Sequence, residues 1–550
     1  MLTGPFLWGH SHGAIVARRG ARASTPRKVW LVAPEESLRR DGPPTGRWRD
    51  PALAALAGLL VFVAFPPFDF GPLSFLALVP LVHVWRSAPP RRAAWLGFVA
   101  GVAAFGPLVW WTSFFGILAW AALVIALAGT WAVAGFLVAG VRSRGVRSPW
   151  VIPAVWSLVE LGRQRWPLGG NTWGEIGYSL HSVSAARSFA AFAGTTGVGF
   201  VIVSVNAWLP EAWVRRAEAD IRSGGWGRDA TRWIVVGAVV VPFIALGSAH
   251  LFRPSFAKTG ELEVVMLQGN DLERDESPEE LEERRLLYGH LDLAARIRGP
   301  VDLVVFPESS VDKDPRRDDE LRGTFASLAR RLQASLVVNV DHAEVPGRED
   351  DDVGYNTNFL FDSEGKLSSK RYAKVKPVPF GEYVPWGSVL RPLIPALDQI
   401  PIDLLRGPGR VQFEVSGHSV GTFICFEVGF ATIARNYTRE GAEVLLVTTN
   451  NSSFRRSANT RQQLAMAQMR SAESGRYLLQ SGISGITAVI DERGRVLQRT
   501  ELFERSATRA TVPTLEGRTP YVLLGDWLPL GAGVILLAAL AWRSRTTSRD

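Results

Sequence analysis

Cys425 is the residue from which the chemistry of this sequence can be argued, because it is the only cysteine among 550 residues. It follows the apolar, β-branched run VGTFI at 420–424, which predicts a buried strand that ends at the thiol. A thiol attacks as its thiolate, and since the pKa of a free cysteine is near ~8.5, a neighbouring base or cation must promote ionisation. A lone cysteine is often only a small buried apolar residue, so the hypothesis of a nucleophile depends on partners elsewhere in the chain.

Two polar stretches upstream supply a candidate base and a candidate cation. The first, VDLVVFPESS at 301–310, predicts a strand with Glu308 just beyond its end. The second, KRYAKVKPVPFGEYVP at 370–385, carries Lys374, and its charges alternate with apolar residues and three prolines, which favours a shaped loop. Taken alone, such a carboxylate or charge run is typical of a solvated surface. Together with a thiol, the two stretches predict acyl transfer through a thioester.

Two further carboxylates are candidates for supporting roles, Glu382 in PFGEYVP and Glu427 in ICFE. In this chemistry a glutamate in a desolvated cleft takes the thiol proton and later activates the second substrate. A lysine ammonium stabilises the oxyanion of the tetrahedral intermediate, a role typically worth several kcal/mol.

Composition excludes several other classes. The histidines stand in no motif, and the chain has neither HExxH nor paired cysteines for zinc, so we expect no metal and no cofactor. One cysteine cannot form an intrachain disulfide. The formal charge of +9 comes from short basic clusters between apolar runs, which indicates a lipid bilayer rather than nucleic acid as the partner.

The residues that carry the chemistry all fall in one polar segment, 253–520. Its apolar runs predict strands separated by helices, and because some strands alternate with helices while others pair directly, we expect a mixed sheet. The predicted strands are 261–268, 301–306, 335–340, 356–361, 411–415, 420–424, 442–449, 485–491 and 496–499. The predicted helices are 276–298, 319–332 and 461–476.

The remainder of the chain consists largely of apolar helices. Residues 1–50 are basic and lack a long apolar run, which indicates a poorly ordered tail rather than a cleavable signal peptide. A transmembrane region is predicted at 51–252, a final span at 521–542 and a short tail at 543–550. The predicted helices are 51–66, 72–85, 93–110, 116–140, 148–161, 188–210, 231–250 and 521–542.

Basic residues in the loops predict the orientation of these helices. The tail 1–50 carries nine Arg and Lys residues, whereas the loops 67–71 and 111–115 carry none. By the positive-inside rule, both termini are cytoplasmic. The segment 253–520, which lies between the seventh and eighth predicted helices, is then extracytoplasmic.

The three stretches with Glu308, Lys374 and Cys425 resemble the Glu–Lys–Cys triad of the nitrilase superfamily. With seven apolar helices before the polar segment and one after it, the chain is similar to the apolipoprotein N-acyltransferase family of bacterial cell membranes. The resemblance extends to WPLGGNTWGEIGYSL (166–180), LQGN (267–270) and RQQLAMAQMRSAESGRYLLQS (461–481). It implies a polytopic α-helical membrane protein of about eight transmembrane helices, with an inserted extracytoplasmic α/β domain of the nitrilase-like αββα sandwich type.

The resemblance also implies the reaction and its partners. Cys425 would accept a fatty acyl chain from a phospholipid donor and pass it to the α-amine of the diacylglyceryl-cysteine of an apolipoprotein, the last step of lipoprotein maturation. Glu308 would be the general base and Lys374 the oxyanion stabiliser. The chain departs from the family pattern in NNSSFRR (450–456), at Phe426 and in SGISG (481–485).

Two other classes of function remain open on the sequence. One is a membrane-anchored carbon–nitrogen hydrolase or amidase, although eight helices exceed what an anchor needs. The other is a non-catalytic membrane scaffold that supports a partner glycosyltransferase, although a scaffold has no need of an intact Glu–Lys–Cys set.

Overall fold

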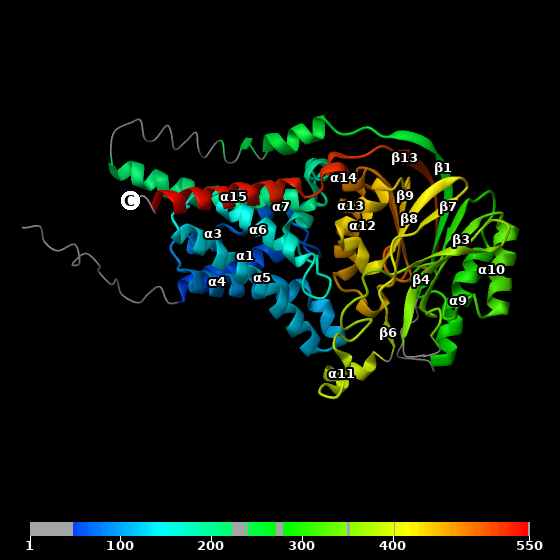
Figure 1. Ribbon diagram of the computed structural model, residues 1–550. Coiled ribbons are helices and arrows are strands. Elements are labelled where there is room, and N and C mark those ends of the chain that lie inside the picture. Colours follow the sequence, from blue (N-terminus) through cyan, green and yellow to red (C-terminus); the bar gives the residue numbers. More distant parts are fainter. Residues whose placement is uncertain are drawn as a thin grey trace, which may run out of the picture. The chain divides into compact units, whose positions relative to one another are not determined.

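A group of apolar helices and a group of strands covered by helices make up the computed structural model (Figure 1). The structure describes residues 48–222, 237, 240, 241, 243–270, 279–348, 353–400 and 402–547. The predicted tail at 1–50 therefore lies almost wholly outside the described residues. The same holds for residues 231–236, 238, 239 and 242 of the predicted helix 231–250 and for the last three residues of the chain.

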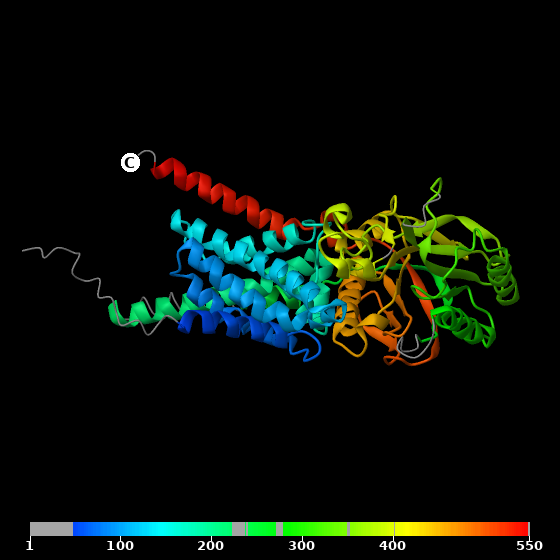
Figure 2. The same ribbon diagram turned by 90° about the horizontal axis from the view of Figure 1, so that it is seen from below.

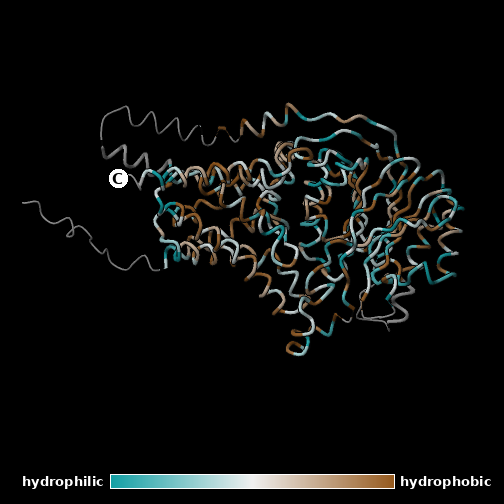
Figure 3. The backbone as a smooth tube through the Cα atoms, viewed as in Figure 1, coloured by the Kyte–Doolittle hydropathy of each residue, from teal (hydrophilic) through white to brown (hydrophobic). Residues whose placement is uncertain are grey.

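The apolar helices pack through small residues and turn large apolar side chains outward. A Cβ on Gly58 or Gly101 would collide with Ala100 or Ala128 of the neighbouring helix, so these glycines permit close approach. Leu59 remains 48% exposed although it is apolar, and so do other large side chains on the outer faces. Hydrophobic residues dominate this part of the chain in Figure 3. These helices are α1 (Arg49–Val63), α2 (Ser74–Ala77), α3 (Val79–Trp85), α4 (Pro90–Leu108), α5 (Ile117–Ser143), α6 (Val151–Arg163) and α7 (Ser184–Arg222).

Two of the predicted helices are each divided in two. The helix predicted at 72–85 is present as an apolar helical stretch but is interrupted at Leu78, between α2 and α3. There the Asn206 side chain accepts from Leu78 N (2.8 Å) and donates to Ser74 O (2.9 Å). Pro80 at the start of α3 has no N–H, so a break there loses little. The helix predicted from 521 begins later, since α14 (Pro520–Leu524) ends at Gly525, whose φ is 66°, before α15 (Trp527–Thr547) starts.

Three helices in the described part of the chain are long and apolar enough to cross a membrane: Ile117–Ser143, Ser184–Glu211 and Trp527–Thr546. The last of these belongs to α15, which contacts α6 and α7 and is otherwise largely exposed (Figure 2). The helix α7 begins earlier than predicted, at Ser184, and is interrupted at Gly194, whose φ is 72°.

Two mixed sheets form the α/β part, which confirms the prediction of mixed strand directions. The first has the order β13 (Ser506–Glu516), β1 (Ala257–Gln268), β2 (Leu303–Val305), β3 (Ser335–Ala343), β4 (Val353–Phe361) and β5 (Leu367–Ala373), with β6 (Asp403–Leu404) beside β4. The second has the order β12 (Val496–Arg499), β11 (Ala488–Ile490), β10 (Tyr477–Gly482), β9 (Val444–Thr449), β8 (His418–Ile424) and β7 (Gln412–Val415). The strands β5, β6, β10 and β13 are additional to the predicted ones.

The two sheets face each other across a shared core, and helices cover their outer faces. Side chains from the inner faces of both sheets belong to one apolar cluster, which continues into the apolar helices. A second cluster lies between the first sheet and the helices α9 (Glu279–Ala295) and α10 (Asp319–Leu332). The helices α12 (Ala431–Arg439) and α13 (Asn459–Ser474) cover the second sheet. The layers are therefore helix, sheet, sheet and helix, as the resemblance implied.

Candidate active site

The three predicted catalytic residues come from strand ends of both sheets. Glu308 follows β2 and Lys374 follows β5 in the first sheet, whereas Cys425 follows β8 in the second. Hydrogen bonds join the two sheets beside them, since Asn358 Nδ2 donates to Thr422 Oγ1 over 2.8 Å. The charges of Glu308 and Lys374 both act on the Cys425 thiol. The structure thus brings together the residues that the sequence singled out.

Lys374 is the cation between two carboxylates. Its Nζ lies 3.2 Å from Oε1 of Glu308 and 2.6 Å from Oε1 of Glu382, and only 1% of its side chain is exposed. Burial lowers the pKa of Lys374, but the two carboxylates more than offset this and hold it well above its usual value. Lys374 is consequently a fixed positive charge beside the thiol.

Glu308 is held by donors on both of its carboxylate oxygens. Besides Lys374, Asn356 Nδ2 donates to Oε1 (2.8 Å), and the backbone N–H of Asn450 donates to Oε2 (2.6 Å). Burial raises the pKa of Glu308, while the Lys374 charge opposes the rise. A carboxylate with a raised pKa is a stronger base, which suits the transfer of a proton from a thiol.

Cys425 occupies a tight turn between β8 and α12. Its φ is 51°, a left-handed conformation that is uncommon for a residue other than glycine and that is often found at functional sites. The Sγ atom lies 3.9 Å from the carbonyl oxygen of Asn450 and 3.8 Å from Nε2 of Gln463. Burial, and then the Glu308 charge, raise the pKa of the thiol to about 12. The resting thiol is therefore protonated and needs a base.

The two supporting carboxylates have different surroundings. Glu382 contacts Lys374 directly and accepts from Val378 N over 2.7 Å, so it fixes the loop that follows the lysine. Glu427 is fully buried and accepts from the N–H groups of Ile424, Val375 and Lys376 and from the Tyr372 hydroxyl, all within 2.9 Å. It ties the cysteine turn to the lysine loop and does not contact the reacting groups.

Amide side chains around the triad were not predicted. Asn339 donates to the side-chain oxygens of Asn356 and Asn358, and Asn356 in turn donates to Glu308. Gln463 is oriented by Thr449, whose hydroxyl lies 3.1 Å from Oε1. The sequence signal for two of these amides is their position: Asn356 and Asn358 lie on a largely buried strand, where a buried amide requires hydrogen-bond partners.

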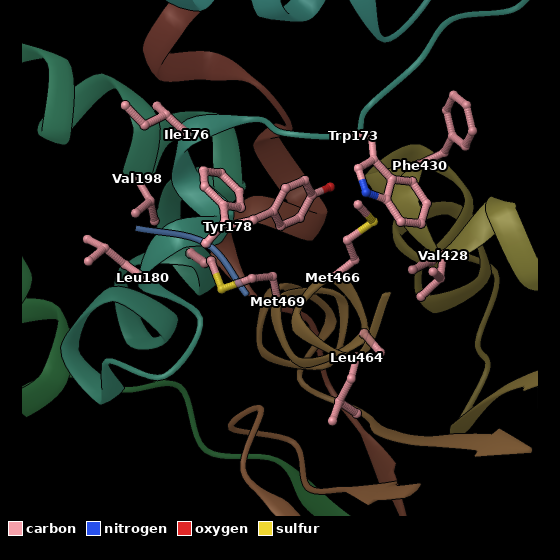
Figure 4. Packing of buried hydrophobic residues seen from close by; sticks show 14 of the residues in the cluster. Trp173, Ile176, Tyr178, Leu180, Val198, Val428, Phe430, Leu464, Met466 and Met469 are labelled. Carbon is pink, nitrogen blue, oxygen red and sulfur yellow. The ribbon is translucent and has the colours of Figure 1, made fainter. Parts of the chain in front are cut away.

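The helix α13 joins this site to the apolar helices. Gln462 accepts from the indoles of Trp111 and Trp173 and donates to the carbonyls of Pro66 and Leu108, so its amide contacts four bundle segments. In Figure 4, Met466 and Met469 of this helix lie beside Tyr178, whose hydroxyl donates to Gly429 O (2.9 Å). Gln463, the next residue after Gln462, contacts the thiol.

Two of the departures from the family pattern, at 450–456 and at Phe426, make aromatic contacts near this junction. Phe454, in the segment 450–456, packs 4.9 Å from Trp111 and 5.5 Å from Phe115, measured between ring centroids. Phe426 packs on Phe430 with ring centroids 5.2 Å apart.

Among the described residues, no cluster of three or more His, Cys, Asp or Glu side chains has the arrangement of a metal site.

Family models match both parts of the chain. Residues 57–208 match the apolipoprotein N-acyltransferase N-terminal domain, and residues 273–518 match the carbon–nitrogen hydrolase domain. Among solved structures, a CN-hydrolase superfamily protein from Xanthomonas campestris is similar, with 16% identity over 46% of this chain and 91% of that chain, at a TM-score of 0.35.

Curated relatives match over nearly the whole chain. An apolipoprotein N-acyltransferase of Azotobacter vinelandii is 31% identical over 90% of this chain and 96% of its own length. Those of Geobacter metallireducens and Nitrosomonas europaea are 30% and 32% identical, over 90% and 88% of this chain and 96% of their own lengths. Family models match both the apolar helical part and the α/β part, and these relatives match over nearly the whole chain. The chain therefore belongs to the apolipoprotein N-acyltransferase family.

Proposed function

We propose that Cys425, Glu308 and Lys374 move a fatty acyl chain from a phospholipid to the α-amine of the N-terminal diacylglyceryl-cysteine of an apolipoprotein. The enzyme is an acyltransferase by family. The observation that carries the proposal is the protonated, half-buried thiol beside a buried carboxylate and a buried ammonium. The names of the relatives support the acceptor, and the apolar helices support lipid substrates.

In the first half-reaction, Glu308 takes the proton from Sγ as the thiolate attacks the carbonyl carbon of the lipid ester. The carbonyl oxygen becomes an oxyanion, which the Lys374 ammonium stabilises. When the intermediate collapses, the carbon–oxygen bond breaks and Glu308 returns the proton to the leaving alkoxide. A lysophospholipid leaves and the acyl group remains on Cys425 as a thioester.

In the second half-reaction, the amine of the acceptor attacks the thioester carbonyl. Glu308 takes a proton from the amine, Lys374 again faces the oxyanion, and the carbon–sulfur bond breaks as the thiol regains a proton. Water is a competing nucleophile, so the partial burial of Cys425 supports transfer over hydrolysis. Glu382 and Glu427 position the lysine loop and the cysteine turn.

The proposed arrangement in the cell membrane follows from the apolar helices and the basic loops. We place a tail at 1–50, seven spans within 51–252, a catalytic domain at 253–520 outside the cytoplasm, an eighth span at 521–542 and a cytoplasmic tail at 543–550. Exposed apolar side chains such as Ile125 and Leu537 support contact with lipid. Both substrates are lipid-anchored, so the site belongs at the membrane surface.

The test is the intact mass of the detergent-purified protein after incubation with phosphatidylethanolamine alone. We expect a single acyl adduct that neutral hydroxylamine removes and that a diacylated lipopeptide with a free N-terminus discharges. A lipopeptide with a blocked N-terminus is the matched control and should leave the adduct in place. Peptide mapping should assign the acyl group to Cys425, and an adduct on a serine or lysine would contradict the thioester.

The same experiment separates the two rival functions. A carbon–nitrogen hydrolase would release fatty acid rapidly without an acceptor, and a scaffold would acquire no adduct. Orientation is tested separately: reporter fusions after residue 216 and at the C-terminus should report cytoplasm, and a fusion within 253–520 should report the outside. A cytoplasmic signal from the catalytic segment would overturn the proposed topology.

A further inference from the structure

Three cationic side chains from separate segments converge where the lysine loop meets the apolar helices. Lys376 lies two residues after Lys374, Arg406 follows β6, and Arg165 follows α6. Burial, and then the charges of Arg406 and Arg165, lower the pKa of Lys376, while the Glu427 carboxylate opposes the shift. Contacts show that the three segments meet: Lys376 Nζ donates to the carbonyl oxygen of Gly169, four residues after Arg165, and Gly407 N, next to Arg406, donates to Lys374 O over 2.8 Å. A group of cations of this kind is stabilised when an anion lies among them.

Lys376 is fixed in the wall of the active site. Its backbone N–H donates to Glu427 (2.9 Å), the carboxylate that also accepts from Ile424 next to the nucleophile. Its Nζ lies 4.5 Å from the centroid of the Phe430 ring and donates to the carbonyl oxygen of Gly169 in the loop after α6. The ammonium therefore stands at the side of the site that faces the apolar helices, with a neutral carbonyl as its partner.

Arg406 is tied to the same strand end. Gly407 N donates to the carbonyl oxygen of Lys374 over 2.8 Å, and Leu405 N donates to that of Gly354, so the backbone on both sides of Arg406 is anchored. Its side chain is exposed and forms no ion pair within the described part of the chain. Arg165, by contrast, lies 3.5 Å from Asp526 and retains 55% exposure. The net positive charge of the group is consequently carried by Lys376 and Arg406.

Apolar side chains border these cations. Trp166, adjacent to Arg165, is 77% exposed, and Phe380, in the same loop as Lys376, is 40% exposed. Glu427 is the nearest buried carboxylate, but its four hydrogen-bond donors already occupy it. A free anion in water gains nothing from exposed aromatic rings, whereas a lipid with a charged headgroup uses both features.

We infer that Lys376 and Arg406, with Arg165 at the margin, form a subsite for the phosphodiester of the donor phospholipid. The glycerol backbone separates the phosphodiester from the ester that reacts, and Lys376 is likewise separated from Cys425 by the Glu427 bridge. The subsite would orient the donor so that its ester meets the thiol, and the acyl chains would extend toward the apolar helices. The inference rests on the proposed function, because it concerns the donor of the same reaction.

The experiment compares two donors with identical acyl chains, phosphatidylethanolamine and diacylglycerol, which lacks the phosphodiester. The initial rate of acylation of Cys425 is measured by intact mass in the full-length protein, with each donor below saturation. The quantity compared between variants is the rate with phosphatidylethanolamine divided by the rate with diacylglycerol, because a general disturbance of the site lowers both rates alike. Charge-assisted hydrogen bonds are worth about 1.5–3 kcal/mol, so the ratio should fall about tenfold or more in Lys376→Gln and in Arg406→Gln.

Two further variants serve as controls. Lys376→Arg keeps the charge and should retain most of the ratio. Lys370→Gln removes an exposed lysine on β5 away from the cluster and should leave the ratio as in the parent protein. An unchanged ratio in Lys376→Gln and Arg406→Gln, with the parent protein acylated, would overturn the subsite alone. A parent protein that neither donor acylates would overturn the proposed function as well.

Inorganic phosphate distinguishes a lipid headgroup from a free anion. Added at constant ionic strength, it should leave the rate with phosphatidylethanolamine almost unchanged, since it lacks the apolar part of the ligand. If phosphate inhibits the parent protein but not the Lys376→Gln and Arg406→Gln double variant, the group binds free phosphate and the assignment to a lipid headgroup is wrong.

Discussion

The two sheets of the catalytic region share one plan but have different surroundings. Each has three parallel strands at its centre, β1, β2 and β3 in the first and β8, β9 and β10 in the second, with antiparallel strands on both sides. The first sheet holds Glu308 and Lys374, the proposed base and cation, and the second holds Cys425, the proposed nucleophile. The likeness in plan ends at the helices that cover them.

The covering helices show the difference. On the first sheet, α10 buries one apolar face that includes Phe325 and exposes its charges, as an amphipathic surface helix does. On the second sheet, α13 is buried at every position except Arg461, although its sequence contains four amide side chains and the charged residues Arg470 and Glu473. Polar residues on α13, such as Gln462 and Glu473, therefore bond to the apolar helices, and the sheet that holds Cys425 is fixed to these helices through the helix that covers it.

The largest expected effect comes from removing one reacting group from either sheet. Cys425→Ala in the second sheet and Lys374→Ala in the first should each lower the transfer rate by about a thousandfold or more, because nucleophile and oxyanion stabiliser act as a unit. The double variant should be no slower than Cys425→Ala. Transfer to a diacylated lipopeptide is the measurement, and additive losses would show that the two sheets act independently.

The next largest effect is expected for a buried ion pair on α13, which has a counterpart of the same spacing on α10, Asp319 and Arg322. Arg470 and Glu473 on α13 lie 3.2 Å apart and are 1% and 2% exposed, and Glu473 also accepts from Thr195 of α7. Arg470→Met leaves a buried carboxylate without its cation and should cost about 3–5 kcal/mol of stability. A marked fall in the melting temperature in detergent is the expected result.

The double variant Arg470→Met, Glu473→Met controls for the loss of volume. Since it removes both buried charges, it should recover much of the melting temperature that Arg470→Met loses. If the single and double variants melt alike, packing rather than charge holds α13 to the apolar helices.

The pH dependence of acylation tests whether the rate follows the ionisation of Glu308, in the first sheet, or that of Cys425, in the second. Glu308 must be a carboxylate to take the proton, and because burial raises its pKa, the rate should rise with pH through a midpoint above the usual 4.5 of a glutamate. The Cys425 thiol, with a pKa of about 12, stays protonated across this range and adds no second rise below pH 9. Single-turnover acylation from pH 4 to pH 9 is the measurement. A midpoint near that of a free thiol would mean that the cysteine ionises without the base.

The smallest effect is expected for the matched pair on α10. Asp319 and Arg322 are also three residues apart, but they are 85% and 39% exposed. Asp319→Asn should cost less than about 1 kcal/mol, since water and salt screen the pair. Its melting temperature should stay close to that of the parent protein, and a loss comparable to that of Arg470→Met would remove the contrast between the two helices.

The three proposed catalytic residues could be singled out from the sequence because they are charged or reactive residues just beyond apolar strands. The residues that orient them could not, because Asn339, Asn356 and Gln463 are common amides whose role depends on partners far along the chain. The strand β13 was missed for a different reason. It contains Pro513, which argues against a central strand, but β13 lies at the edge of its sheet, where a missing N–H is tolerated.

The apolar helices were easier to locate than to delimit. Hydropathy runs on through 521–542, but Gly525 and Asp526 interrupt the helix, and Asp526 pairs with Arg165 of the loop after α6. Likewise, the break between α2 and α3 depends on the Asn206 amide, 128 positions from Leu78. Local composition cannot register either contact, because both join segments distant in sequence.

The pairing of β1 with β13 has a consequence for how the chain is built. Ala257, at the start of β1, is the register partner of Glu516, at the end of β13, so the strands that enter and leave the α/β part are neighbours. The α/β part therefore leaves and rejoins the helical part of the chain at nearly the same place, as a hairpin loop does. A unit with adjacent ends can be inserted into a helical chain, or exchanged for another, without altering the spacing of the helices that flank it.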